Sequence, residues 1–291
     1  MTATTGNVAV SGAAAGYRRG ATLSLMTEIR RQLSRRRTQY ALGFMVLLPV
    51  ILLIAFQFGG PSSASATRGV SLVDLATSGG PNFAAFVFYA SATFLLVVVV
   101  ALFCGDTVAG EASWGSLRYL LAAPVPRARL LLQKLVVGFL STAVAVVLLL
   151  VSAVIGGTLV YGWHPLETPT GAQIGAGQSM LLLLAAAAFI LVHLLMVGSL
   201  GFLLSVRTDQ PLLAVGGAVM LYIISNILDL VPALENIRPV LPTAYNLAWL
   251  GLFASPVQLD DMAKGAISAL LYSTVFLALA WRSFQRKDIV S

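Results

Sequence analysis

Residues 105–134 read GDTVAGEASWGSLRYLLAAPVPRARLLLQK, and this polar interruption between two long hydrophobic runs decides how the rest of the chain is arranged. Leu120 and Leu121 follow Leu117 by three and four positions, which predicts a short helix with one apolar face. Pro124 removes a backbone donor and disfavours helical geometry in the residue before it, so this helix is expected to end there. A short amphipathic helix between two membrane spans is a candidate docking element.

The composition identifies an integral membrane protein. Of the 291 residues, 58% are hydrophobic and only 10% are charged. Soluble domains carry roughly 25% charged residues, so this chain cannot cover a globular surface with polar groups. We therefore expect one membrane bundle over residues 23–288, preceded by a disordered cytoplasmic N-terminus over residues 1–22, which are small and polar.

Six hydrophobic runs are long enough to cross a bilayer, which needs about 20 apolar residues as a helix. The sequence thus predicts an all-α polytopic fold with spans at residues 40–58, 83–103, 135–160, 179–204, 211–231 and 262–284. Residues 59–82 are rich in Gly, Ser and Pro and are expected to form a loop. Residues 232–262 are too polar to span the membrane but contain apolar side chains such as Trp249 and Phe253.

The stretch from residue 23 to 39 combines an apolar stripe with five arginines, at positions 30, 31, 35, 36 and 37. Such a helix is expected to lie in the membrane interface and to favour anionic lipid headgroups. A polybasic site for nucleic acid is the alternative, but the adjacent span argues against it.

The distribution of Lys and Arg predicts the orientation of the chain in the membrane. Fifteen of these residues fall on the side that holds both termini and residues 105–134, and three fall on the other side. Because positive loops remain in the cytoplasm, both termini and the docking element are expected there, in the inner or plasma membrane. The net charge of +7 then belongs to the inner leaflet, and no nucleic-acid partner is expected.

Catalytic chemistry is not indicated. None of the three lysines follows a glycine, so the chain contains no P-loop motif for ATP. Ser179 and His193 are fourteen positions apart on one predicted helix, about 21 Å, which is too far for a catalytic dyad. Two histidines, one cysteine and scattered carboxylates supply no metal-ligand spacing. We therefore expect no catalytic residues and no metal site.

Polar residues inside predicted spans are candidates for a translocation path. The fifth span places Tyr222, Ser225, Asn226 and Asp229 at spacings of three and four, and Phe86 and Tyr89 lie in the second span. The alternative is that the fifth-span face only holds helices together through hydrogen bonds. The sequence leaves both interpretations open.

Residues 105–134 resemble the first cytoplasmic loop of type-2 ATP-binding-cassette (ABC) transporter permeases, the class that includes drug and polysaccharide exporters. That loop has a Glu, a Gly-Thr/Ser-Leu triplet, a Leu-Leu pair, Pro-Val-x-Arg and a final Lys. The matching residues, which the resemblance assigns to coupling with an ATPase, are Glu111, Gly115, Ser116, Leu117, Arg118, Leu120, Leu121, Pro124 and Arg127, followed by Lys134. Ala112 departs from the family, which usually has a charged residue there.

The span layout extends the resemblance over most of residues 20–288. It implies an N-terminal elbow helix, a cytoplasmic coupling helix and short re-entrant helices between the last two spans. It further implies an exporter permease that works as a homo- or heterodimer, with membrane lipids around it. ATP and Mg are then expected on a separate nucleotide-binding subunit and not on this chain.

Two other classes compete with this interpretation. A secondary, ion-coupled transporter would need no ATPase, but it is expected to show inverted repeats and mid-membrane carboxylates. A membrane-embedded enzyme would need the catalytic groups that the sequence lacks.

Overall fold

The protein's structure is a computed structural model that describes residues 24–58, 72–113, 115, 127–168 and 171–286. The predicted disordered N-terminus, residues 1–22, lies outside these ranges. Within them the chain is almost entirely helical, as the sequence predicted. One short hairpin, β1 (Leu166–Glu167) and β2 (Gln173–Ile174), is the only strand pair in the described ranges.

Among the described residues, six helices are long and apolar enough to cross a membrane, which confirms the prediction of a six-span, multi-pass membrane protein. They are α2 (Arg36–Phe58), α5 (Leu95–Ser113), α7 (Arg127–Tyr161), α8 (Ala176–Arg207), α9 (Pro211–Asp229) and α10 (Asp260–Gln285). Helices satisfy every backbone group internally, and this is why apolar runs of this length adopt that form in lipid.

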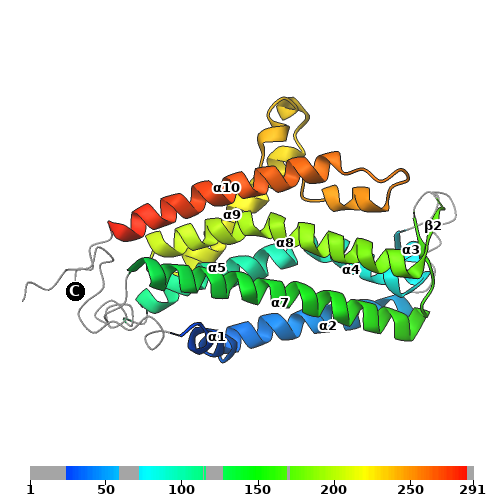
Figure 1. The fold of residues 1–291 in the computed structure, drawn as a ribbon, viewed down its shortest axis with the longest axis horizontal. Helices are drawn as coiled ribbons and strands as arrows, with labels where there is room; N and C mark the ends of the chain where they lie inside the picture. The colour runs from blue at the N-terminus through cyan, green and yellow to red at the C-terminus, as the bar shows by residue number, and fades with distance from the viewer. Residues whose placement is uncertain (1–23, 59–71, 114, 116–126, 169–170, 287–291) are drawn as a thin grey trace, which may run out of the picture.

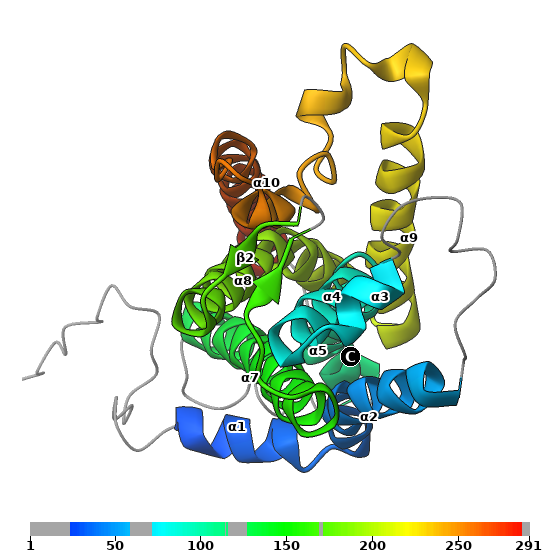
Figure 2. The same ribbon diagram turned by 90° about the vertical axis from the view of Figure 1, so that its right-hand side faces the viewer.

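Most of the long helices run side by side along the long axis of the molecule (Figure 1). Helix α8 is central, because it packs against α5, α9 and α10, and α5 is also flanked by α7 and α9. Figure 2 shows the bundle nearly end-on, with α1 (Leu25–Leu33) running crosswise to the bundle axis, and Figure 1 shows that α1 lies at one end of the bundle. Ser24 caps α1 by accepting a hydrogen bond from the Thr27 amide at 3.2 Å.

The second span differs from its prediction as one continuous helix over residues 83–103. It is divided into α4 (Gly80–Ala92) and α5, with a break at Thr93 and Phe94. The Ser91 hydroxyl donates to the Val87 carbonyl one turn earlier, a contact that often bends helices. Helix α5 then continues to Ser113, so residues 105–113, which we expected in a polar loop, are helical instead.

The predicted basic helix over residues 23–39 is also divided. Helix α1 ends at Leu33, and α2 begins at Arg36 after a short turn at Ser34 and Arg35. Figure 2 shows the resulting change of direction between the two helices. This bend gives residues 25–58 the shape of an elbow.

The connections hold more structure than the sequence suggested. The prediction of a loop over residues 59–82 is wrong in part, because α3 (Leu72–Thr77) and the first turn of α4 lie within this range. Asn82 anchors the β-hairpin to α4: its side chain donates to the Glu167 carbonyl at 2.8 Å and accepts from the Glu167 amide at 2.9 Å. Between α9 and α10 the chain forms three short 3-10 helices, η2 (Pro232–Leu234), η3 (Arg238–Val240) and η4 (Ala248–Phe253).

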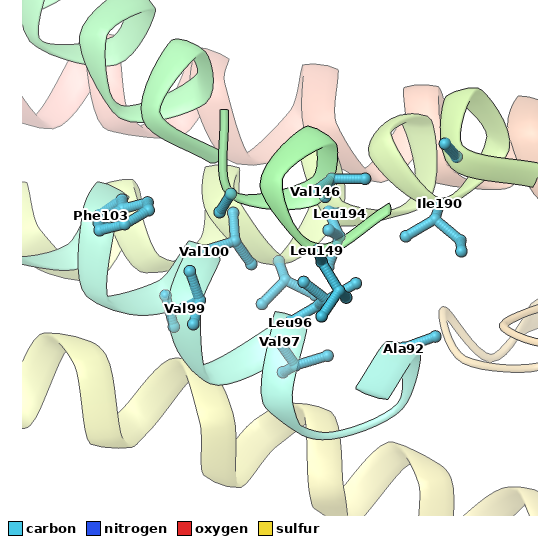
Figure 3. Close-up of a cluster of buried hydrophobic side chains, with 14 of the residues drawn as sticks. Ala92, Leu96, Val97, Val99, Val100, Phe103, Val146, Leu149, Ile190 and Leu194 are labelled. Atoms are coloured by element: carbon cyan, nitrogen blue, oxygen red, sulfur yellow. The ribbon is translucent and has the colours of Figure 1, made fainter. Parts of the chain in front are cut away.

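The hydrophobic core extends through most of the bundle, and Figure 3 shows the part of it between α5, α7 and α8. Its labelled members from α5 are Leu96, Val97, Val99, Val100 and Phe103, which face Val146 and Leu149 of α7 and Ile190 and Leu194 of α8. Gly105 lets α5 approach α9 closely, since a Cβ there would lie 3.3 Å from the Val215 backbone. This tight contact between α5 and α9 lies directly before Asp106, the first charged residue of α5.

Candidate functional site at the α1 end of the bundle

Charged side chains from α1, the start of α2, the end of α5 and the start of α7 meet at one end of the bundle. They form an ionic cluster of seven residues: Glu28, Arg31, Arg35, Arg37, Asp106, Glu111 and Lys134. Burying charges is costly unless each one is paired and hydrogen-bonded, so the geometry of each pair decides whether the cluster is stable.

Glu111 is the centre of the ionic cluster. Its side chain is only 1% exposed, and its two oxygens accept from Arg31 Nη2 at 2.7 Å and Arg35 Nη2 at 2.9 Å. Lys134 Nζ lies 3.4 Å from the same carboxylate. Three cations therefore compensate one enclosed anion, and short charge-assisted bonds of this kind are the strong ones.

Asp106 lies five positions before Glu111 on α5 and is paired separately. It accepts from Arg35 Nη1 and from Arg37 Nη1, each at 3.1 Å. Arg35 thus uses both terminal nitrogens and joins the two carboxylates of α5 to the turn between α1 and α2. Because guanidinium donors are held in a rigid fork, this bridge also sets the position of α5 relative to that turn.

Lys134 connects the beginning of α7 to the ionic cluster. Its side chain is 3% exposed, and its ammonium donates to Glu28 of α1 at 3.0 Å and to Glu111 of α5 at 3.4 Å. The three helices α1, α5 and α7 are therefore held together by one lysine and two glutamates.

Next to the ionic cluster lies a hollow of about 630 Å³. It is lined by Ser34 and four arginines of the α1–α2 region and by one glycine and two acidic residues of α5: Arg31, Arg35, Arg36, Arg37, Asp106, Gly110 and Glu111. A cavity with this lining can hold an anionic group. No group of three or more potential metal ligands occurs within the described ranges.

A serine on α8 fastens the same part of α5. The Ser205 hydroxyl accepts from the backbone amides of Val108 and Ala109 at 3.0 and 2.9 Å. A side chain inserted beside the helical ladder in this way ties α5 to α8 between Asp106 and Glu111. The end of α5 is thus held on one side by Ser205 and on the other by the ionic cluster.

The structure describes only part of the predicted coupling set. Glu111 is in α5 and inside the ionic cluster, Gly115 has a left-handed backbone with φ of 67°, and Arg127 begins α7. The side chain of Arg127 is not described. The predicted docking helix and the remaining coupling residues lie outside the described ranges: Ser116, Leu117, Arg118, Leu120, Leu121 and Pro124.

The polar face of α9 contacts the segment that follows it. Ser225 and Thr243 hydroxyls lie 2.8 Å apart, and Asn246 donates to the Asn226 side chain at 2.9 Å. Asp229 Oδ1 lies 3.4 Å from Arg238 Nε. These bonds hold residues 238–246 against α9.

Other predicted path residues lie among aromatic rings. Tyr222 is buried, and its ring stands edge-on to His193 of α8 with 6.5 Å between ring centroids. The ring of Phe86 in α4 packs against the ring of Phe56 in α2, with 5.2 Å between ring centroids, and Tyr89 is 39% exposed. Helix α4 packs chiefly on α7, whereas α9 packs on α5 and α8, so the two parts of the predicted path have different neighbours.

The ionic cluster as a unit was not predicted from the sequence. Asp106 was not among the predicted site residues, Lys134 was named only as the last residue of the family motif, and the arginines were assigned only to lipid. One signal was present: two carboxylates, Asp106 and Glu111, follow directly on a hydrophobic run, and a chain with so few charges has an arginine-rich segment to neutralise them.

Residues 50–290 match the model of a family described as "Protein of unknown function (DUF2705)". No curated protein matches the chain.

Proposed function

The chain belongs to the DUF2705 family, and we propose that this multi-pass membrane protein is the permease subunit of an ABC exporter. In this proposal the chain forms the translocation path, and a separate nucleotide-binding subunit binds ATP and Mg and hydrolyses the ATP. A second permease chain, identical or different, completes the path.

One observation carries the proposal. The segment that resembles the ABC docking loop is bracketed by Glu111 and Lys134, which lie 3.4 Å apart and are both bonded to α1. A force applied to that segment by a partner would reach α5 and α7 at the same point and α1 with them. A movement on the partner would therefore act on three helices as one body instead of bending a loose loop.

The arrangement of charge supports an orientation in which the docking segment faces the cytoplasm. The ionic cluster and Arg207 lie at the end of the bundle where α1 crosses it, and this is the end that the Lys and Arg count assigns to the cytoplasm. We accordingly propose that both termini and the docking segment face the cytoplasm, where an ATPase subunit can reach them.

The experiment that tests the proposal changes the docking segment and measures the partner. A Leu carried into a hydrophobic groove contributes roughly 1.5–3 kcal/mol when it is fully buried. Leu121→Asp removes that contribution and places a charge in the groove. We expect a tagged wild-type chain, purified from its own cells in mild detergent, to bring along an ATP-binding subunit and ATPase activity, and Leu121→Asp to lose both.

The matched control is Leu259→Asp, which makes the same change at an exposed residue preceding α10. It should insert normally and keep the partner. Retention of the ATPase by Leu121→Asp, or absence of an ATP-binding subunit from the wild-type preparation, would refute the assignment. The second result would favour a secondary transporter.

A further inference from the structure

The hollow beside the ionic cluster contains more positive charge than its own carboxylates compensate. Four arginines, at positions 31, 35, 36 and 37, line it together with Asp106 and Glu111. This is an excess of two positive charges. Lys134 and Glu28 pair with each other beside it and leave the balance unchanged.

Two of these arginines, Arg36 and Arg37, have N–H donors that are not used in ion pairs with the carboxylates of the cluster. Arg31 and Arg35 are engaged with Glu111 and Asp106. Arg37 uses one terminal nitrogen on Asp106, and Arg36 forms no ion pair within the part of the chain that the structure describes. Since each guanidinium has five N–H donors, Arg36 and Arg37 can both donate to an oxyanion in the hollow. The carboxylates would not repel it strongly, because their own oxygens are already bonded to cations.

A stripe of exposed apolar residues begins at Arg36 and follows α2 along the bundle. Tyr40, Phe44, Leu47 and Ile51 succeed Arg36 at spacings of four, four, three and four, so they share one face of the helix. All four are exposed, Tyr40 to 73%. A free phosphate ion has no apolar group that would contact this stripe, whereas the acyl chain of a lipid can lie along it. Tyrosine next to a basic residue is also typical of the membrane interface.

We propose that the hollow binds the phosphate of an anionic phospholipid, with Arg36 and Arg37 as its donors and the α2 stripe as the contact for its acyl chain. Ser34 also lines the hollow, and its hydroxyl can add a hydrogen bond. This site is more specific than a general attraction of α1 to acidic membranes, since it depends on two arginines of α2. It does not require the proposed transport function.

Matched single substitutions test the site. Arg36→Gln removes an exposed arginine that lines the hollow, and Arg30→Gln removes an exposed arginine of α1 that does not. The full chain is purified in mild detergent after equilibration with vesicles of phosphatidylcholine and phosphatidylglycerol, and the retained lipids are quantified by mass spectrometry. We expect the wild type to retain phosphatidylglycerol selectively and Arg36→Gln to lower the apparent affinity about five-fold, whereas Arg30→Gln leaves it unchanged.

Three further measurements separate the alternatives. Arg36→Lys, which keeps the charge, should retain more phosphatidylglycerol than Arg36→Gln does. Inorganic phosphate at millimolar concentration should not displace the lipid; displacement would assign the hollow to free phosphate. Equal losses in Arg30→Gln and Arg36→Gln would reduce the site to diffuse attraction, and efficient disulfide cross-linking between two copies of Tyr40→Cys would place a second chain on the stripe. Displacement by phosphate, equal losses in the two variants, or efficient cross-linking would each overturn the proposal.

Discussion

Lys134 Nζ lies 3.4 Å from Glu111 Oε1, an ion pair across 23 positions in which both side chains are almost fully enclosed. The pair closes the two ends of the segment that resembles an ABC docking loop. Arg31 and Arg35 also bind Glu111, and Glu28 also binds Lys134. The α1 region is therefore bound both to the end of α5 and to the beginning of α7. This relationship has consequences that can be measured.

Glu111→Gln should destabilise the protein strongly. The amide cannot balance Arg31, Arg35 and Lys134, and removing one partner of a buried ionic group typically costs about 3–5 kcal/mol. We expect a loss near the lower end, on the order of 3 kcal/mol, because the glutamine oxygen still accepts one hydrogen bond. Unfolding in detergent, followed by circular dichroism, measures the effect. Glu235→Gln, at an exposed position, is the control; if it shifts unfolding as much, the ionic cluster is not the cause.

Ser205→Ala should weaken the attachment of α5 to α8. The substitution removes the acceptor for the Val108 and Ala109 amides, which are buried. Hydrogen bonds in membrane proteins contribute about 0.6 kcal/mol on average and up to about 1.7. With two amides affected, we expect a loss of about 1–1.5 kcal/mol. Ser273→Ala removes only a bond to the serine's own helix and should have a smaller effect; equal effects would contradict the prediction.

Asn226 and Asn246 should act as a unit. Each of Asn226→Leu and Asn246→Leu removes the 2.9 Å bond between them, and each should reduce stability by about 0.6 kcal/mol. The double variant should lose less than the sum of the singles, because the shared bond can be lost only once. Full additivity would show that the two side chains do not interact. A change in transport by a stable Asn226→Leu variant would in turn support the predicted path.

The orientation can be tested with single cysteines, since the native Cys104 is buried and should stay silent. Gln173→Cys and Ser255→Cys place thiols at exposed positions of connections that the charge count assigns to the outside. Gln210→Cys places one in the exposed turn between α8 and α9, assigned to the cytoplasm. In intact cells an impermeant maleimide should label the first two only. The reverse pattern would invert the topology.

The helix content and the six spans followed from the sequence alone. A bilayer requires about 20 apolar residues for each helical crossing, and such runs are visible without any knowledge of their neighbours. The ends of the spans were less certain, because a helix can continue into polar sequence when other segments supply partners. Helix α5 continues to Ser113 for this reason, with Asp106 and Glu111 neutralised by arginines.

The candidate site depended on the tertiary structure. A motif identified Glu111, but the residues that bind it, Arg31 and Arg35, lie 80 and 76 positions away. Hydropathy and helical spacing report only on near neighbours in the chain, whereas an ion pair forms between any two segments that packing brings together. The sequence by itself therefore determined which segments cross the membrane. Only the packing of α1 across the ends of α5 and α7 decided which charges meet, since burying them is favourable only where every one finds a partner.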